Sequence, residues 1–196
     1  MQTGDGRVVY AQYDDGETLR SADGGHTWHV AIAFDRSGNS VCPQGMTTGI
    51  NTQPGAQDWA LCTSQAGAGN QGKQVFRLRS RGWARVACTT IDGGGCHYGG
   101  ISSYGYPQGI AAASRGDFAI IWETRGTLYV TRNGGRHWIA LPKVAPPDAF
   151  GWWASVLPHG LGFVILDDGG IQKRRLIETT DAGRTWHVVH HWAATG

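Results

Sequence analysis

Residues 21–28 read SADGGHTW, and two later stretches repeat this pattern. Residues 131–138 read TRNGGRHW and residues 179–186 read TTDAGRTW, so all three place Ser or Thr, Asp or Asn, Gly, Thr or His, and Trp at the same spacing. A decayed fourth copy at residues 79–83 reads RSRGW and keeps the tryptophan. The tryptophans at 28, 83, 138 and 186 are 55, 55 and 48 residues apart. A period near 50 residues indicates a propeller or a similar repeat array.

The residue types of the motif predict a tight turn. An Asp or Asn side chain accepts hydrogen bonds from nearby backbone N–H groups, and the glycine tolerates a positive φ. The tryptophan then buries a large surface between neighbouring sheets. β-like runs flank each copy, for example residues 127–130 before the second motif and 139–141 after it. Each motif is therefore predicted to be the turn of a β-hairpin.

Further β-like runs upstream of each hairpin complete a pattern of four-stranded units. We expect an all-β fold: a single propeller domain over residues 1–196, built of four antiparallel blades at about 1–34, 35–88, 89–141 and 142–192. The first blade is predicted to be incomplete, because its second strand begins near Arg7 and leaves no room for a first strand. Either the ring closes with four blades, or these blades are part of a larger propeller.

The composition agrees with this fold and excludes other classes. The chain has 31 glycines and nine tryptophans among 196 residues, and only 16% of its residues are charged. That much glycine argues against a helical bundle, and the aromatic content argues against a disordered chain. No apolar run is long enough for a transmembrane helix. A net charge of +2 is too small to indicate nucleic-acid binding.

The repeated motif resembles the Asp-box, or BNR repeat. This repeat occurs in sialidases, xyloglucan-type glycoside hydrolases, sortilin-type receptors and proteins similar to photosystem II assembly factors. The resemblance implies that the box joins strands 3 and 4 of a blade, at the periphery and away from any active site. Propellers of this family usually have six or seven blades. The residues implied to be structural are Ser21, Asp23, Gly25, Thr27, Trp28, Thr131, Asn133, Gly135, Trp138, Thr179, Asp181, Gly183, Thr185 and Trp186.

Ligands are expected on the opposite face, where loops join strand 2 to strand 3 within a blade and strand 4 to the next blade. The long 4–1 loops are rich in aromatic residues, which suit sugar stacking or protein contact. The alternative is that these rings pack beneath their own loops. The candidate ligand-binding residues are Tyr98, Tyr104, Tyr106, Trp152 and Trp153.

A glycoside hydrolase would need two facing carboxylates on this face. The pairs to test combine Asp167 or Asp168 with Glu123 or Asp92. Asp167 and Asp168 precede a glycine, as do Asp14 and Asp15, and this repetition favours a turn instead. The Phe/Tyr-Arg-Ile-Pro motif of sialidases is absent from the sequence. No residue spacing indicates a metal site or a cofactor, so none is predicted.

The four cysteines are Cys42, Cys62, Cys88 and Cys96. They allow three disulfide pairings, of which Cys42–Cys62 with Cys88–Cys96 closes two local loops; buried free thiols are the alternative. Disulfides would place the protein outside the cytosol. The N-terminal MQTGDGRVV has no apolar segment, so export would require a signal peptide preceding this sequence.

Three functional hypotheses follow. The first is an extracytoplasmic scaffold that binds a carbohydrate or protein ligand through the 4–1 loop face. The second is a fragment or divergent member of a glycoside hydrolase, with some catalytic carboxylates in further blades. The third is a repeat protein of the assembly-factor type, which binds another protein. The sequence leans towards a protein that is not an enzyme.

Overall fold

The computed structural model describes residues 2–3, 9–12, 18–32, 46–51, 59–79, 82–89, 99–113, 117–146, 149–167 and 174–192. Within these ranges the regular elements are β-strands, apart from one 3-10 turn, η2 (Pro158–Gly160). In the same ranges no helix is long and apolar enough to cross a membrane. The all-β prediction is therefore confirmed.

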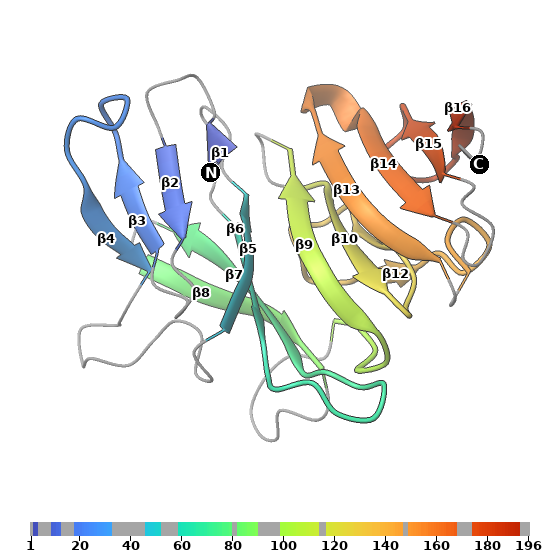
Figure 1. Ribbon diagram of the computed structural model, residues 1–196, viewed down its shortest axis with the longest axis horizontal. Helices are drawn as coiled ribbons and strands as arrows, with labels where there is room; N and C mark the ends of the chain where they lie inside the picture. Colours follow the sequence, from blue (N-terminus) through green and yellow to red (C-terminus); the bar gives the residue numbers. More distant parts are fainter. Residues whose placement is uncertain are drawn as a thin grey trace.

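The described strands form four antiparallel four-stranded units in chain order, which we call blades 1 to 4; the first two are separate sheets, and the last two join into one eight-stranded sheet (Figure 1). Blade 1 holds β1 (Gln2–Thr3), β2 (Val9–Gln12), β3 (Thr18–Ser21) and β4 (His29–Ile32). Blade 2 holds β5 (Met46–Asn51), β6 (Trp59–Thr63), β7 (Lys73–Arg79) and β8 (Gly82–Cys88). Blade 3 holds β9 (Tyr106–Ala112), β10 (Ala119–Thr124), β11 (Tyr129–Thr131) and β12 (Ile139–Ala140). Blade 4 holds β13 (Phe150–Val156), β14 (Gly162–Asp167), β15 (Arg174–Thr179) and β16 (His187–Trp192).

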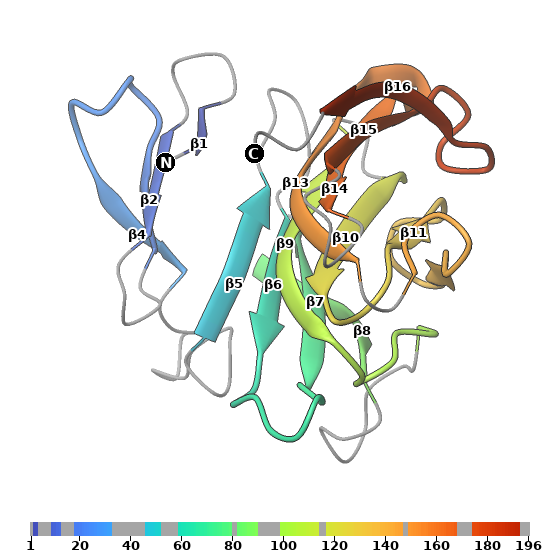
Figure 2. The same ribbon diagram turned by 45° about the vertical axis from the view of Figure 1, so that its right-hand side comes forward.

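The blades follow one another in an open arc, with blade 1 and blade 4 at its two ends (Figures 1 and 2). The first strands of the later blades line the inside of this arc, where β9 contacts both β5 and β13. One residue pair, Thr124 with Phe150, also links the sheets of blades 3 and 4. The ends of the β9, β10, β13 and β14 strands therefore meet near this point.

Blade 1 differs from the sequence prediction. We expected no first strand, but Gln2 and Thr3 form a two-residue strand that pairs with Tyr10 and Val9 of β2. The expectation was wrong because a strand of two residues leaves no periodic pattern to detect. The other sheets lie within their predicted blade ranges.

The three complete motifs form the same turn between the third and fourth strands of blades 1, 3 and 4. In blade 4 the Thr179 hydroxyl donates to Asp181 Oδ1 (2.9 Å) and accepts from the Gly183 N–H (2.8 Å). Asp181 also accepts from the backbone N–H (2.9 Å) and the hydroxyl (2.7 Å) of Thr185. These bonds hold the pKa of the Asp181 carboxyl well below its usual range. The turn chemistry inferred from the motif is therefore present at the atomic level.

The hydrophobic core lies between blades. One cluster joins blades 2 and 3, and a second joins blades 3 and 4. Strand β10 contributes to both because its side chains alternate: Ile121 faces blade 2, and Ile120 faces blade 4. A strand covered on both faces reads as a continuous apolar run, as β10 does.

Candidate functional site

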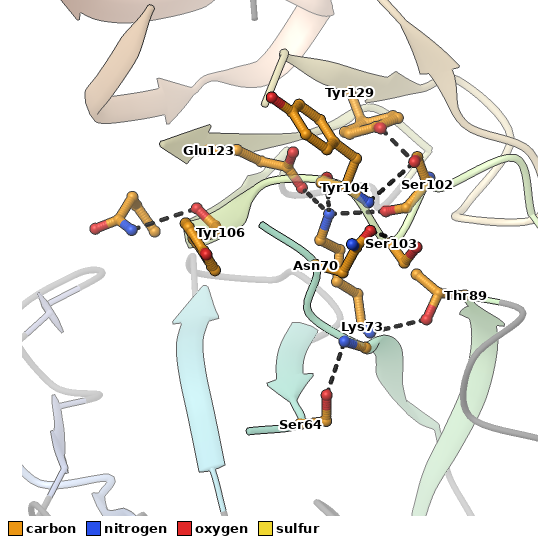
Figure 3. Close-up of polar contacts among 12 residues, drawn as sticks. Ser64, Asn70, Lys73, Thr89, Ser102, Ser103, Tyr104, Tyr106, Glu123 and Tyr129 are labelled. Carbon is orange, nitrogen blue, oxygen red and sulfur yellow. Dashed lines mark hydrogen bonds and ion pairs between the residues drawn. The ribbon is translucent and has the colours of Figure 1, made fainter. Parts of the chain in front are cut away.

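A fully buried ion pair lies between blades 2 and 3, at the face where the 2–3 and 4–1 loops emerge (the loop face). Lys73 begins β7 directly after the 2–3 loop of blade 2, and Glu123 is the next-to-last residue of β10, directly before the 2–3 loop of blade 3. Lys73 Nζ and Glu123 Oε1 are 2.6 Å apart, and neither side chain is exposed to solvent (Figure 3).

The ammonium group of Lys73 also holds the segment that enters β9. It donates to the carbonyl oxygens of Ser102 and Tyr104, each at 2.7 Å. With Glu123, these two acceptors satisfy all three ammonium protons. Lys73 therefore connects three parts of the chain, β7, β10 and the 4–1 segment 102–104, at a single atom (Figure 3).

Burial sets the protonation behaviour of the pair. Loss of solvation raises the pKa of Glu123 to about 7, although the neighbouring Lys73 acts in the opposite direction. Burial likewise lowers the pKa of Lys73, and Glu123 opposes that shift. The carboxylate lies directly against Gly105 and Gly126, where a side chain at either position would collide with it. Glycine at these positions is thus a packing requirement of the ion pair.

The 2–3 loop of blade 2 packs on the same 4–1 segment. The backbone N–H of Gln71 donates to Ser103 O (2.8 Å), and the N–H of Gly105 donates to Gly69 O (2.9 Å). The Tyr106 hydroxyl accepts from the Gly69 N–H at 2.9 Å. Tyr104 is bound only through its backbone in these contacts, and its side chain is 49% exposed. The Tyr104 ring is therefore exposed, while hydrogen bonds hold the backbone segment that carries it.

A second aromatic group lies at the start of β13. The Trp152 side chain is 50% exposed, its ring centroid lies 4.9 Å from that of Phe150, and the Arg174 guanidinium stacks over it at 4.5 Å. Arg174 Nε in turn lies 3.7 Å from Asp167 Oδ2. Trp152 falls at a β-bulge between Gly151 and Trp153. The bulge explains why two consecutive tryptophans are both exposed on one strand.

The structure gives the predicted carboxylates separate partners. Glu123 is buried against Lys73, whereas Asp167 pairs with Arg174. Asp92, Asp168 and Tyr98 lie outside the described residues, so the catalytic pairs that include them stay predictions. Of the predicted aromatic residues, Tyr104, Trp152 and Trp153 are exposed, and the hydroxyl of Tyr106 is engaged by the 2–3 loop.

Lys73 is the functional residue that sequence reasoning missed. The sequence signal is weak, because Val75 alone is apolar among the residues that share the face of Lys73 on β7; Arg77 and Arg79 follow it. A buried ammonium group requires a partner. Its partner is 50 residues further along the chain, however, and nothing in the local pattern identifies Glu123.

Cys62 on β6 and Cys88 on β8 are both buried and both lie opposite Gln74 of β7. They are separated by two strand spacings, roughly 10 Å, which is too far for a bridge between them. Cys42 and Cys96 lie outside the described residues. Within those residues, no three metal-ligating side chains form a group that could hold an ion.

Comparisons with known proteins give the fold. No family model matches the chain, and no curated protein sequence matches it. Solved structures match over 95% of the chain: YCF48 bound to a D1 peptide (TM-score 0.52, 14% identity), YCF48 from Cyanidioschyzon merolae (0.52, 11%) and a GH74 xyloglucanase from Xanthomonas campestris (0.50, 14%). The chain covers 50%, 56% and 28% of those three chains, respectively. The fold is therefore that of a β-propeller, and the chain spans about half the length of the YCF48 structures.

Proposed function

We propose that this protein is a non-catalytic Asp-box propeller scaffold that binds a segment of another protein on the loop face. The observation that carries the proposal is the Tyr104 site. Two backbone–backbone hydrogen bonds, together with the ammonium group of the buried ion pair, fix the segment around it, and the ring itself is half exposed. A rigid aromatic side chain loses little entropy on binding, so such residues are effective anchors for a ligand.

Two further observations support this proposal. Trp152 gives the loop face a second exposed ring, stacked with Arg174, and Trp and Arg are enriched at protein-binding hot spots. A structurally similar propeller, YCF48, has been solved bound to a D1 peptide. The three motif turns also have the hydrogen bonds that their residue types predict, which supports their assignment as Asp-boxes.

An extracytoplasmic location is part of the proposal. It rests on the predicted disulfides of the four cysteines, of which Cys62 and Cys88 are both buried in blade 2. Because these two cannot pair with each other, the local pairing Cys42–Cys62 with Cys88–Cys96 and the crossed pairing are the two that remain. Disulfides persist in oxidising compartments.

The test is a binding screen of the purified chain against a random peptide display library and a glycan array. We expect enrichment of peptides, and Tyr104→Ala and Trp152→Ala should each weaken the binding of an enriched peptide at least tenfold. Leu157→Ala is the matched control, because Leu157 is also exposed but follows the opposite end of β13.

The structural similarity to a xyloglucanase suggests a competing hypothesis, that the protein is a glycoside hydrolase. A panel of chromogenic glycosides should give no release of the chromophore. Hydrolysis of any of them, lost in Glu123→Gln, would replace the scaffold with a glycoside hydrolase. Glycan binding without peptide binding would retain a scaffold but change its ligand class.

A further inference from the structure

Each inner blade has a forward face, turned to the next blade, and a backward face, turned to the previous one. On the forward face of blade 2, Leu61 and Val75 are fully buried against blade 3. On the forward face of blade 3, Ile120, Trp122 and Leu128 are buried against blade 4. An apolar forward face covered by a neighbour is therefore a repeated feature of the chain.

Blade 4 has the same forward face without a blade on it. Thr131 lies opposite Ala119 in blade 3, and Thr179 lies opposite Gly162 in blade 4, which aligns the two sheets. This alignment makes Phe163, Ile165 and Leu176 the counterparts of Ile120, Trp122 and Leu128. All three are apolar but only half-buried. Trp153, which pairs with Ile165 and so shares its face, is 47% exposed.

Blade 1 has an apolar backward face that no described blade covers in this structure. Ser21 lies opposite Val9, so Ala11, Leu19 and Trp28 are the counterparts of Ile121, Tyr129 and Trp138 on the backward face of blade 3. The blade 3 residues are buried against blade 2, whereas the blade 1 residues are half-exposed. Val30, which pairs with Leu19, is 55% exposed.

The motif tryptophan shows how a backward face docks on a forward face. Trp138 of blade 3 packs on Trp59 of blade 2 in an edge-to-face contact, with ring centroids 6.2 Å apart. Trp186 of blade 4 is partly buried and packs against the cluster shared by blades 3 and 4. Trp28 is the equivalent residue of blade 1. Blade 1 lies at the opposite end of the arc from blade 4 (Figure 2).

We propose that two copies of this chain dock head to tail, with the backward face of blade 1 of each copy on the forward face of blade 4 of the other. Two chains of four blades then close a ring of eight, and both contacts are of the kind that already joins blades 2, 3 and 4. A second copy fits because it carries both missing faces, and a head-to-tail contact that closes forms a ring.

Light scattering coupled to size-exclusion chromatography tests the proposal on the 196-residue chain. We expect a particle of twice the 21.1 kDa chain mass. Leu176→Asp, which places a charge on the forward face, should give the mass of one chain. Val188→Asp is the matched control: Val188 is exposed on the same blade but pairs with Ile177, so it points to the other face. That variant should stay at the double mass.

Mixing distinguishes the head-to-tail ring from other dimers. Leu19→Asp should also be monomeric, while circular dichroism shows that each variant keeps its strands. A mixture of Leu19→Asp and Leu176→Asp retains one intact contact, so the double mass should return. A wild-type chain that runs as a monomer at tens of micromolar overturns the proposal. A dimeric Leu19→Asp variant also overturns the proposal, since it would mean that the backward face of blade 1 does not form the contact.

Discussion

At the scale of single residues, the buried threonine hydroxyl that opens the motif turn is the strongest link between sequence and structure. Thr179 is fully buried, and its hydroxyl both donates to Asp181 and accepts from the Gly183 N–H. Every partner lies within four residues, where spacing determines the geometry, so the motif alone is enough to predict a tight turn here.

Thr179→Val keeps the shape of this side chain and removes its hydroxyl. We expect it to lower the free energy of unfolding by about 1–3 kcal/mol, because the Gly183 N–H is left without a partner in a buried position. Urea denaturation measures the change. The neighbouring Thr180 is exposed, so Thr180→Val is a control that should change stability by less than about 0.5 kcal/mol. Equal losses in the two variants would contradict this role of the hydroxyl.

The Lys73–Glu123 pair, unlike the motif turn, joins residues that are far apart in the sequence. Its members come from different blades, so sequence spacing could predict neither the pair nor the role of Lys73. The sequence makes Glu123 a candidate only because it is a carboxylate near a loop.

The raised pKa of Glu123 means that the folded state retains a proton which the unfolded state releases between about pH 4.5 and 7. This group's contribution to stability is therefore full below pH 4.5 and is lost as the pH rises to 7. Glu123→Gln keeps the shape of the side chain but cannot ionise, so we expect it to remove this part of the pH dependence. Urea denaturation at pH 5 and pH 8 should show the fall in the wild type and not in Glu123→Gln. An equal fall in the variant would assign the pH dependence to another group.

At the scale of elements, the motif turn is also a packing wedge between blades. Gly135 has a φ of +85°, and a Cβ there would approach Val86 and Trp59 of blade 2 within 3 Å. Gly25 in blade 1 has a similar φ of +96°, yet a Cβ there would meet only Trp28, at 3.6 Å. The two glycines thus share a positive φ and differ in their packing against a preceding blade.

Gly135→Ala and Gly25→Ala separate these two effects. Both variants pay the strain of a positive φ, about 1–2 kcal/mol, but only Gly135→Ala should add an overpacking cost of about 1–3 kcal/mol. We therefore expect Gly135→Ala to lower the thermal unfolding midpoint more than Gly25→Ala, as measured by calorimetry. Equal shifts would show that the turn does not act as a wedge.

The elements were largely predictable because strands covered on both faces read as apolar runs, as β6 and β10 do. Two features were not. The β1 strand is too short to have a pattern, and the bulge in β13 depends on pairing with β14. Without the bulge, alternation would place Trp152 and Trp153 on opposite faces, and sequence could not show that both are exposed.

At the scale of the whole molecule, the four blades were predictable and their association was not. The forward face of blade 4 has the same residue types as the forward faces of blades 2 and 3, so a sequence pattern cannot distinguish a covered face from an uncovered one. Only the comparison of burial at aligned positions, such as Leu176 with Leu128, shows the difference.

The proposed ring makes folding and association one equilibrium. If blades 1 and 4 are each covered by the other copy, dimer formation stabilises the folded state by mass action, and the thermal midpoint must rise with protein concentration. We expect that rise in the wild type and in Val188→Asp over a hundredfold range, from about 1 to 100 μM. Leu176→Asp should melt at one temperature throughout this range, near the midpoint of the most dilute wild-type sample, because its half-ring is already open. Light scattering on the same samples should show that the dilute wild type is partly dissociated. If the wild-type midpoint is nevertheless independent of concentration, the contact between copies does not cover the faces on blades 1 and 4.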